Sequence, residues 1–297
     1  MSSAVLATFG PQPHALDEIK TRPGFWKRFR RHKVAVISLA FLIFMGLAAL
    51  LTPYISPYDP YAMNLVEANQ KPSLEHPLGT DKLGRDTLTR VFVGGRVSIL
   101  VALAAVAIST SLGTVLGLMA GFRGGWVDTV IMRITDIFMA FPLFVLLIVL
   151  VSMLGPSARN VVLILGFFSW MGVARLVRGQ VLSVMNQPYI EAANSTGVRN
   201  GRMIARHVLP NSFVPIVVAS TLGVANAMLS EAALSFLGLG IQPPTPSWGN
   251  MLTSAQSLQV LINEPWLWIG PGLAIALTVL SINFMGDGLR DALDPHL

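Results

Sequence analysis

Six long apolar segments, separated by polar ones, constrain this chain more than any other feature of its sequence. An α-helix needs about 20 residues to cross the hydrocarbon core of a membrane, and each segment is close to that length or exceeds it. Inside a bilayer, the backbone satisfies its hydrogen bonds only in helices or closed barrels. The sequence therefore predicts an all-α, polytopic membrane protein with six transmembrane helices, at residues 34–51, 97–120, 127–154, 161–181, 213–239 and 266–285.

The composition supports a membrane protein and excludes several other classes. Hydrophobic residues make up 53% of the chain and charged residues only 12%, whereas soluble domains carry about 25% charged residues. The net charge of +6 does not indicate nucleic-acid binding, because Lys and Arg mostly flank the apolar segments and form no patch interleaved with aromatic residues. The chain contains no cysteine, which excludes disulfides and thiolate metal sites.

The distribution of Lys and Arg predicts the orientation in the membrane. Basic residues are concentrated before the first apolar segment and in the segment 182–212, whereas 241–265 contains neither Lys nor Arg. Loops rich in Lys and Arg face the cytoplasm, so both termini and the segment 182–212 are expected there. We therefore expect a cytoplasmic N-terminal tail at 1–33 and a transmembrane domain at 34–297. The segments 52–96 and 241–265 of this domain are expected to face outward.

The polar segment between the fourth and fifth apolar segments has the composition of two short helices. Pro188 suits the first turn of a helix, and Gly197 allows a sharp break after it. A second, amphipathic helix follows, and we expect Leu209 and Pro210 to stop it before the next span, because proline lacks an amide donor. Such a knob could bind in a groove on a partner or lie on anionic lipid as an amphipathic helix. Both interpretations stay open on physical grounds.

Two carboxylates, Asp136 and Glu231, fall inside predicted spans. Charged groups in a membrane are costly, so they usually face the interior of a bundle and mark a solute pathway or a buried partner. The alternative is a structural hydrogen bond or ion pair, for example between Asp136 and Arg133 one turn away. Both interpretations stay open. Glu231 also begins a second Glu-Ala-Ala sequence, but no Gly or Leu-Pro follows it at the spacing seen after Glu191.

Small residues recur every fourth position in the second predicted span, at Ser109, Gly113, Gly117 and Gly121. This spacing predicts a close helix–helix contact, with a partner helix in this chain or in another.

Several kinds of chemistry find no support in the sequence. It contains no phosphate-binding GxxxxGK[ST] motif, no nucleophile–base constellation and no histidine inside a predicted span. We therefore expect that the chain is not an enzyme and binds no cofactor or metal ion by itself.

The polar segment resembles the coupling loop of ABC-importer permeases, which docks onto the ATP-hydrolysing subunit. The resemblance rests on the spacing of a Glu-Ala-Ala start, a Gly and a Leu-Pro, and His207 occupies a position where the general pattern prefers Ile. The residues that it implies for ATPase coupling are Glu191, Ala192, Ala193, Gly197, Arg202, Arg206, His207, Leu209 and Pro210.

Nearly the whole chain resembles the dipeptide/oligopeptide/nickel class of ABC permeases. Its long first outer loop and its ending are similar to the second, C-type permease of such systems. The matching stretches are HPLGTD (76–81), GRD (84–86), GGWVD (124–128), ARLVRGQ (174–180), LSFLGLG (234–240), QPP (242–244), PSWG (246–249), MGDGLRD (285–291) and DP (294–295).

This resemblance implies the fold of a type I ABC-importer permease in a bacterial cytoplasmic (inner) membrane. It implies a heterodimer with a homologous permease subunit, two ATP-binding subunits that hydrolyse ATP with magnesium, and an extracytoplasmic solute-binding protein. The segments 52–96 and 241–265 would meet the binding protein, and Trp248, Trp266 and Trp268 suit the membrane interface there.

An alternative from another class is an ion-coupled secondary transporter or a channel that acts without an ATPase. Within the permease class, the sequence does not distinguish dipeptides, oligopeptides, glutathione-like molecules and nickel chelates as solutes.

Overall fold

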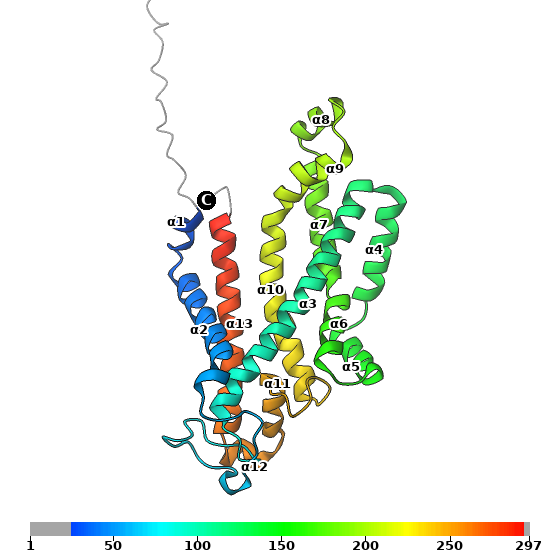
Figure 1. Ribbon diagram of the computed structural model, residues 1–297. Helices are drawn as coiled ribbons and strands as arrows, with labels where there is room; N and C mark the ends of the chain where they lie inside the picture. The colour runs from blue at the N-terminus through cyan, green and yellow to red at the C-terminus, as the bar shows by residue number, and fades with distance from the viewer. Residues whose placement is uncertain (1–24, 294–297) are drawn as a thin grey trace, which may run out of the picture.

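The computed structural model describes residues 25–293 and contains no β-strand in that range. Long helices run side by side, and short helices lie at both ends of the bundle (Figure 1). We call the end that carries α8 (Pro188–Ser195) the α8 end, and the end that carries α12 (Leu258–Asn263) the α12 end.

The remaining elements follow one another with short connections, except for the segments 56–86 and 237–247. They are α1 (Phe25–Phe29), α2 (Lys33–Ile55), the 3-10 helix η1 (Leu65–Glu67), α3 (Thr87–Arg123), α4 (Gly125–Met139), α5 (Leu143–Leu154), α6 (Ala158–Phe168), α7 (Trp170–Met185), α9 (Asn200–Met203), the π-helix η2 (Ile204–Val208), α10 (Leu209–Phe236), α11 (Trp248–Met251), the 3-10 helix η3 (Leu252–Gln256) and α13 (Trp266–Leu293).

Among the described residues, five helical stretches are long and apolar enough to cross a membrane, and the α4–α5 pair supplies a sixth if it counts as one span. The pair bends by 84°. Figure 1 shows α3 and α7 both ending at the α8 end, while α6 starts nearer the other end. The chain must therefore cross the bundle between α3 and α6, which makes α4 and α5 together one broken span.

The prediction of one helix at 127–154 was therefore wrong. Pro142 lies at the break as the residue before α5. Proline has no amide hydrogen to donate and disfavours helical conformation in the residue that precedes it. Apolar length alone did not reveal this break, because apolar residues predominate on both sides of it.

The glycine repeat of α3 packs against α7 of the same chain, which answers the question that the sequence left open. A Cβ at Gly117 would lie 2.5 Å from the carbonyl oxygen of Ala174 and 2.8 Å from the Cβ of Val177. Gly113 and Gly121 face Val173 and Val181 in the same way. We call this contact the α3–α7 seam. Because a valine of α7 packs directly against each glycine of α3, the two backbones approach more closely than they could if α3 carried a side chain at these positions.

The segment between α2 and α3 is shorter than the predicted 52–96, because both helices extend into it and leave 56–86 between them. Hydrogen bonds between its side chains hold this segment together. His76 is buried, and its Nδ1 lies 2.9 Å from Oδ1 of Asp86. Asp86 also caps α3 by accepting a hydrogen bond from the amide of Thr89. This end of α3 is thus held by buried polar contacts, which hydropathy could not reveal.

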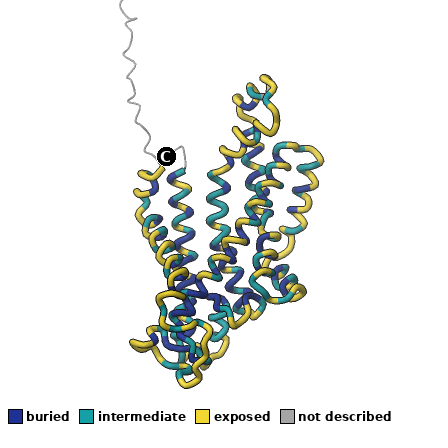
Figure 2. The backbone as a smooth tube through the Cα atoms, in the orientation of Figure 1, coloured by how far each residue is buried: buried dark blue, intermediate teal, exposed yellow. Residues whose placement is uncertain are grey.

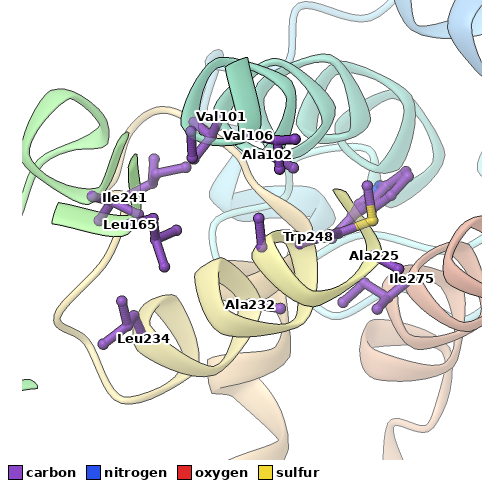
Figure 3. Close-up of a cluster of buried hydrophobic side chains, with 14 of the residues drawn as sticks. Val101, Ala102, Val106, Leu165, Ala225, Ala232, Leu234, Ile241, Trp248 and Ile275 are labelled. Atoms are coloured by element: carbon purple, nitrogen blue, oxygen red, sulfur yellow. The ribbon is translucent and has the colours of Figure 1, made fainter. Parts of the chain in front are cut away.

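The predicted outer segment 241–265 folds back into the bundle and contains α11, η3 and α12. Trp248 is fully buried in the main hydrophobic core, beside α3 and α10 (Figure 3). Its indole nitrogen donates a hydrogen bond to the carbonyl of Val91 at 2.7 Å. The assignment of Trp248 to a membrane-interface belt was therefore wrong, because its ring fills the space in front of Gly95.

Candidate functional site

The most prominent feature of the α8 end is a knob formed by residues 188–208, which we call the α8 knob. Figure 1 shows α8 projecting past the ends of α3 and α4, and Figure 2 shows that this part of the chain is largely exposed. The first helix of the knob begins at Pro188. The chain then reverses through Gly197, whose φ of 74° lies in the left-handed region that glycine adopts without strain.

A small hydrophobic cluster fixes the α8 knob on the end of α7. Ile190, Met203 and Val208 are buried, and they pack with Val181 and Val184 of α7. Both limbs of the knob contribute to this cluster. The α8 knob is therefore a defined body joined to the bundle, because burial of its apolar side chains stabilises one arrangement of the two limbs.

The outer surface of the α8 knob carries most of the residues that the sequence singled out. Gly197 is open on its outer side, since a Cβ there would meet nothing within 4 Å. The arginines of the knob form no ion pair within the described residues, so this surface keeps its positive charge. The exposed residues are Glu191, Ala192, Gly197, Arg202, Arg206, Leu209 and Pro210, while Ala193 and His207 are partly buried.

The second limb does not end at Pro210, so the prediction of a separate second helix was wrong. The helix runs on from Asn200 to Phe236, with a π-helical turn before Pro210. A π turn is wider than an α turn, which accommodates a residue that cannot make the usual backbone hydrogen bond. The side-chain amide of Asn211 donates to the carbonyl of His207 at 2.6 Å, so this carbonyl beside the proline is satisfied.

His207 connects the two limbs. Its ring lies against that of Tyr189 in α8, with 6.0 Å between the ring centroids. This contact gives a structural role to the residue at which the chain departs from the general coupling-loop pattern.

An ion pair near the base of the α8 knob joins α4 to α7. Nε and Nη2 of Arg178 each donate to a carboxylate oxygen of Asp128 at 2.5 Å. This two-fold contact matches the planar geometry of guanidinium and carboxylate groups. It holds the otherwise loosely packed α4 beside the helix that carries the α8 knob.

Replacing Asp128 by Asn is expected to lower the free energy of unfolding by about 2 kcal/mol, the range of hydrogen bonds to charged groups. Thermal unfolding of the purified protein in a mild detergent measures the change. Asp287→Asn serves as the control, since Asp287 is exposed and forms no ion pair within residues 25–293. The exchanged pair Asp128→Arg with Arg178→Asp should recover part of the loss, and equal melting of the Asn variant and the wild type would contradict the assignment.

Glu231 is fully buried at the centre of a hydrogen-bond network near the α12 end. Ser98 donates to its Oε2 at 3.0 Å, and Ser235 donates to its Oε1 at 2.7 Å. The two serine hydroxyls in turn accept hydrogen bonds from the backbone amides of Trp248 and Ile241. The carboxylate therefore links α3 and α10 to the segment that folds back between them.

Asp136 has a different environment, and its partner is not the predicted one. Its Oδ1 accepts a hydrogen bond from Nη2 of Arg175 in α7 at 2.7 Å, and no contact with Arg133 is formed. Both side chains of the pair are about half exposed, at 53% for Asp136 and 50% for Arg175. Arg175 is separated from Asp136 by 39 positions, so only the tertiary structure reveals the pair.

A hollow of about 910 Å³ opens on one side of the bundle, between α10 and the elements α3 to α7. Its lining is mostly apolar, with hydroxyl and amide groups interspersed, and no charged residue contributes to it. The polar side chains in the lining are Ser109, Thr110, Ser169, Ser220, Asn226 and Ser230. A hollow of this size is large enough to hold a small solute.

The bundle of spanning helices, its lateral hollow and the projecting α8 knob together define a multi-pass membrane permease. The comparison with known families agrees with this class. Residues 113–297 match the family described as "Binding-protein-dependent transport system inner membrane component", and residues 24–72 match "N-terminal TM domain of oligopeptide transport permease C". The chain belongs to the family of binding-protein-dependent transport system inner membrane components.

Relatives with assigned roles cover almost the whole chain. It is 45% identical over 285 residues to the glutathione transport system permease protein GsiD of Escherichia coli O6:K15:H31, covering 95% of this chain and 93% of the relative. It is 42% identical over 272 residues to the dipeptide transport system permease protein DppC of Alkalihalophilus pseudofirmus, covering 92% and 89%.

A solved structure confirms the fold. The chain resembles a structure of the MetNI methionine ABC transporter in an inward-facing conformation, with a TM-score of 0.55 and 18% sequence identity. The match covers 70% of this chain and 98% of that one. The all-α, type I importer-like permease fold predicted from the sequence is thus confirmed, and the chain is an ABC-transporter permease. These matches do not favour a transporter or channel that acts without an ATPase.

Proposed function

We propose that this chain is the C-type permease subunit of an ABC importer for peptides or related small solutes, and that the α8 knob couples it to ATP hydrolysis. The observation that carries the proposal is the knob itself, a fixed body whose outer surface is exposed and positively charged. A helix that rested on lipid would lie beside the bundle at the membrane surface, whereas the α8 knob projects past the neighbouring helices (Figure 1). Projection favours docking into a protein partner.

The proposed orientation places the α8 end in the cytoplasm. The short helix α1 lies at this end, and its neighbourhood contains Lys27, Arg30 and Arg31. The α8 knob adds further arginines, while the segment at the α12 end that follows α10 has no Lys or Arg up to residue 265. By the positive-inside rule both termini are cytoplasmic, and the tail 1–33 precedes the transmembrane domain 34–297. Residues 1–24 and 294–297 of these segments lie outside the described residues.

The continuous helix from Asn200 to Phe236 provides a physical route for coupling. Its first turns belong to the α8 knob, and further along it contributes Ser220 and Asn226 to the hollow. A displacement of the knob by a closing ATPase therefore moves a wall of the hollow directly. This is a rigid-body mechanism of alternating access, with no chemical step in the permease itself.

The proposed assembly has partners at the hollow, at the α8 end and at the α12 end of the permease. A homologous permease subunit closes the hollow and forms a heterodimer with this chain. Two cytoplasmic ATP-binding subunits bind and hydrolyse ATP with magnesium and receive the α8 knobs. An extracytoplasmic solute-binding protein delivers the solute to the α12 end, where the segments 56–86 and 241–265 lie. Peptides are proposed as the solute class because the relatives bear the names of dipeptide and glutathione transport systems.

The proposal is tested by expressing the tagged chain together with the proposed partner subunits and purifying it in mild detergent. We expect a second permease, two ATPase subunits and, after addition, a binding protein to associate with it. Peptide-loaded binding protein should stimulate ATP hydrolysis, and the complex in liposomes should take up that peptide only with ATP. Active transport by a homo-oligomer of this chain alone would refute the proposal, and the ligand that co-purifies with the binding protein identifies the solute.

A further inference from the structure

The ion pair of Asp136 and Arg175 lies within membrane-spanning helices but is half exposed on the surface of this chain. A charged pair cannot face lipid at low cost. Such groups face a water-filled cavity or another protein and mark solute or ion pathways. The environment that covers this pair can be deduced from the two helices that carry it.

The exposed side of helix α4 has an apolar edge and a polar edge. One edge is apolar and strongly exposed, as expected for contact with lipid. The other is polar and includes Arg133 and Asp136, one turn apart, with Thr129 a turn before them. The exposed apolar residues are Trp126 (76%), Val130 (45%), Ile134 (43%) and Ile137 (60%). The exposed side of the helix thus changes from an edge suited to lipid to an edge suited to water or protein.

Helix α7 shows a matching polar face. Gly172, Arg175 and Gly179 recur at helical spacing and are exposed. A Cβ at either glycine would meet nothing within 4 Å in this chain, so neither glycine serves an internal helix contact. A lipid-facing stripe would carry large apolar side chains, and this one carries an arginine between two glycines.

These polar faces continue the wall of the hollow toward the α8 end. Gly172 of α7 and Met139 of α4 line the hollow. Arg175 and Asp136 lie one helical turn further on the same two faces. The ion pair is therefore placed between the hollow and the α8 end, where a solute that leaves the hollow toward that end would pass.

The charges of this group favour an anionic ligand. The lining of the hollow contains no charged residue. In the adjoining group Asp136 neutralises only one arginine, and Arg133 forms no ion pair within residues 25–293. Two arginines and one carboxylate leave an excess of positive charge, which attracts an anion.

We propose that Arg133 and Arg175, with Asp136 holding Arg175 in place, form a carboxylate-binding station on the solute pathway. Its ligand is the terminal carboxylate of a peptide-like solute, which a guanidinium group binds with two parallel hydrogen bonds. The choice of solute rests on the proposed function, and the location of the station rests on the geometry alone. The competing occupant of this face is the partner permease subunit, in which case the group would be closed to water.

Cysteine labelling tests the location without any solute. The chain has no cysteine, so Thr129→Cys and Gly179→Cys each introduce a single thiol one turn from an arginine of the station. In the complete transporter, we expect the anionic reagent 2-sulfonatoethyl methanethiosulfonate to react roughly tenfold faster than its trimethylammonium counterpart, because a positive local potential concentrates anions. Ile134→Cys on the lipid-facing side is the control and should stay unreactive.

A second substitution ties the charge preference to Arg133. Adding Arg133→Gln to Thr129→Cys should reduce the ratio of the two labelling rates, while Arg123→Gln, an exposed arginine at the end of α3, should leave it unchanged. The dipeptide Ala-Ala should slow labelling, and Ala-Ala amide, which lacks the carboxylate, should not. Unreactive thiols at both positions would show that a subunit covers this face and would overturn the proposal. A rate ratio near one, or equal protection by the two peptides, would also overturn it.

The labelling and uptake measurements test the station and the proposed function independently. If peptides are transported but the thiols show no charge preference, the station is refuted and the proposed function stands. If the labelling pattern and its dependence on Arg133 hold but no peptide is transported, the peptide assignment is refuted and an anion-binding position in the pathway stands.

Discussion

Gly197→Asp is expected to reduce ATP-dependent uptake about tenfold or more while leaving the amount of membrane-inserted protein unchanged. Gly197 has a φ of 74°, a conformation in which Asp is tolerated better than most residues. A Cβ at this position would meet nothing within 4 Å in this chain, so the fold has room for the new side chain. In the proposed complex the same space belongs to the ATPase, and a buried carboxylate there would be costly.

Two measurements accompany this prediction. Uptake is measured with the complete transporter in liposomes, and co-purification of the ATPase subunits reports whether docking itself is lost. Gly238→Asp is the matched control, because Gly238 also has a positive φ of 77° and open space around it, but lies after the other end of α10. Unimpaired uptake by the Gly197 variant would contradict the coupling role, as would an equal loss in both variants. Normal ATPase association with normal uptake would favour a knob that rests on lipid.

Gly117→Val is expected to prevent folding of most of the protein or to lower its melting temperature strongly. The first added carbon alone would approach the carbonyl oxygen of Ala174 to 2.5 Å and the Cβ of Val177 to 2.8 Å. Overpacking of a buried contact costs about 1–3 kcal/mol even for smaller insertions, and here a backbone atom stands in the way. Size-exclusion chromatography in mild detergent, before and after heating, measures the folded fraction.

Gly46→Val is the control for the Gly117 variant. Gly46 also lies within a spanning helix, α2, but a Cβ there would meet nothing within 4 Å. It should fold like the wild type. A Gly117 variant that is as stable as the Gly46 variant would show that α3 and α7 are not held together as the structure has them.

Apolar length predicted the spans, because hydrocarbon thickness sets the length of any helix that crosses it. It failed where other forces determine the backbone. The third span is broken at Pro142, and the start of α3 extends outward to Thr87 because Asp86 caps it there. Trp248 illustrates the same limit, since its burial depends on the glycine that faces it from α3.

The α8 knob was partly predictable, because local residue types determine its first helix and its turn at Gly197. The path after the turn was not, since the wide π turn before Pro210 lets a single helix continue where a proline usually ends one. The carboxylates show the contrast most clearly. Asp136 was recognisable as unusual from its position, but the sequence could not show that its partner is Arg175 on a different helix.

The α3–α7 seam limits which parts of the molecule can move during transport. A valine side chain of α7 packs against each of three successive glycines of α3. Neither helix can therefore slide or rotate past the other without a steric clash. We therefore expect these two helices to move together as one rigid unit, along with the α8 knob that packs on the end of α7. The broken α4–α5 span lacks such interlocking glycines, and it forms the opposite wall of the hollow. We therefore expect opening and closing of the hollow to involve the α4–α5 span more than any sliding of α3 along α7.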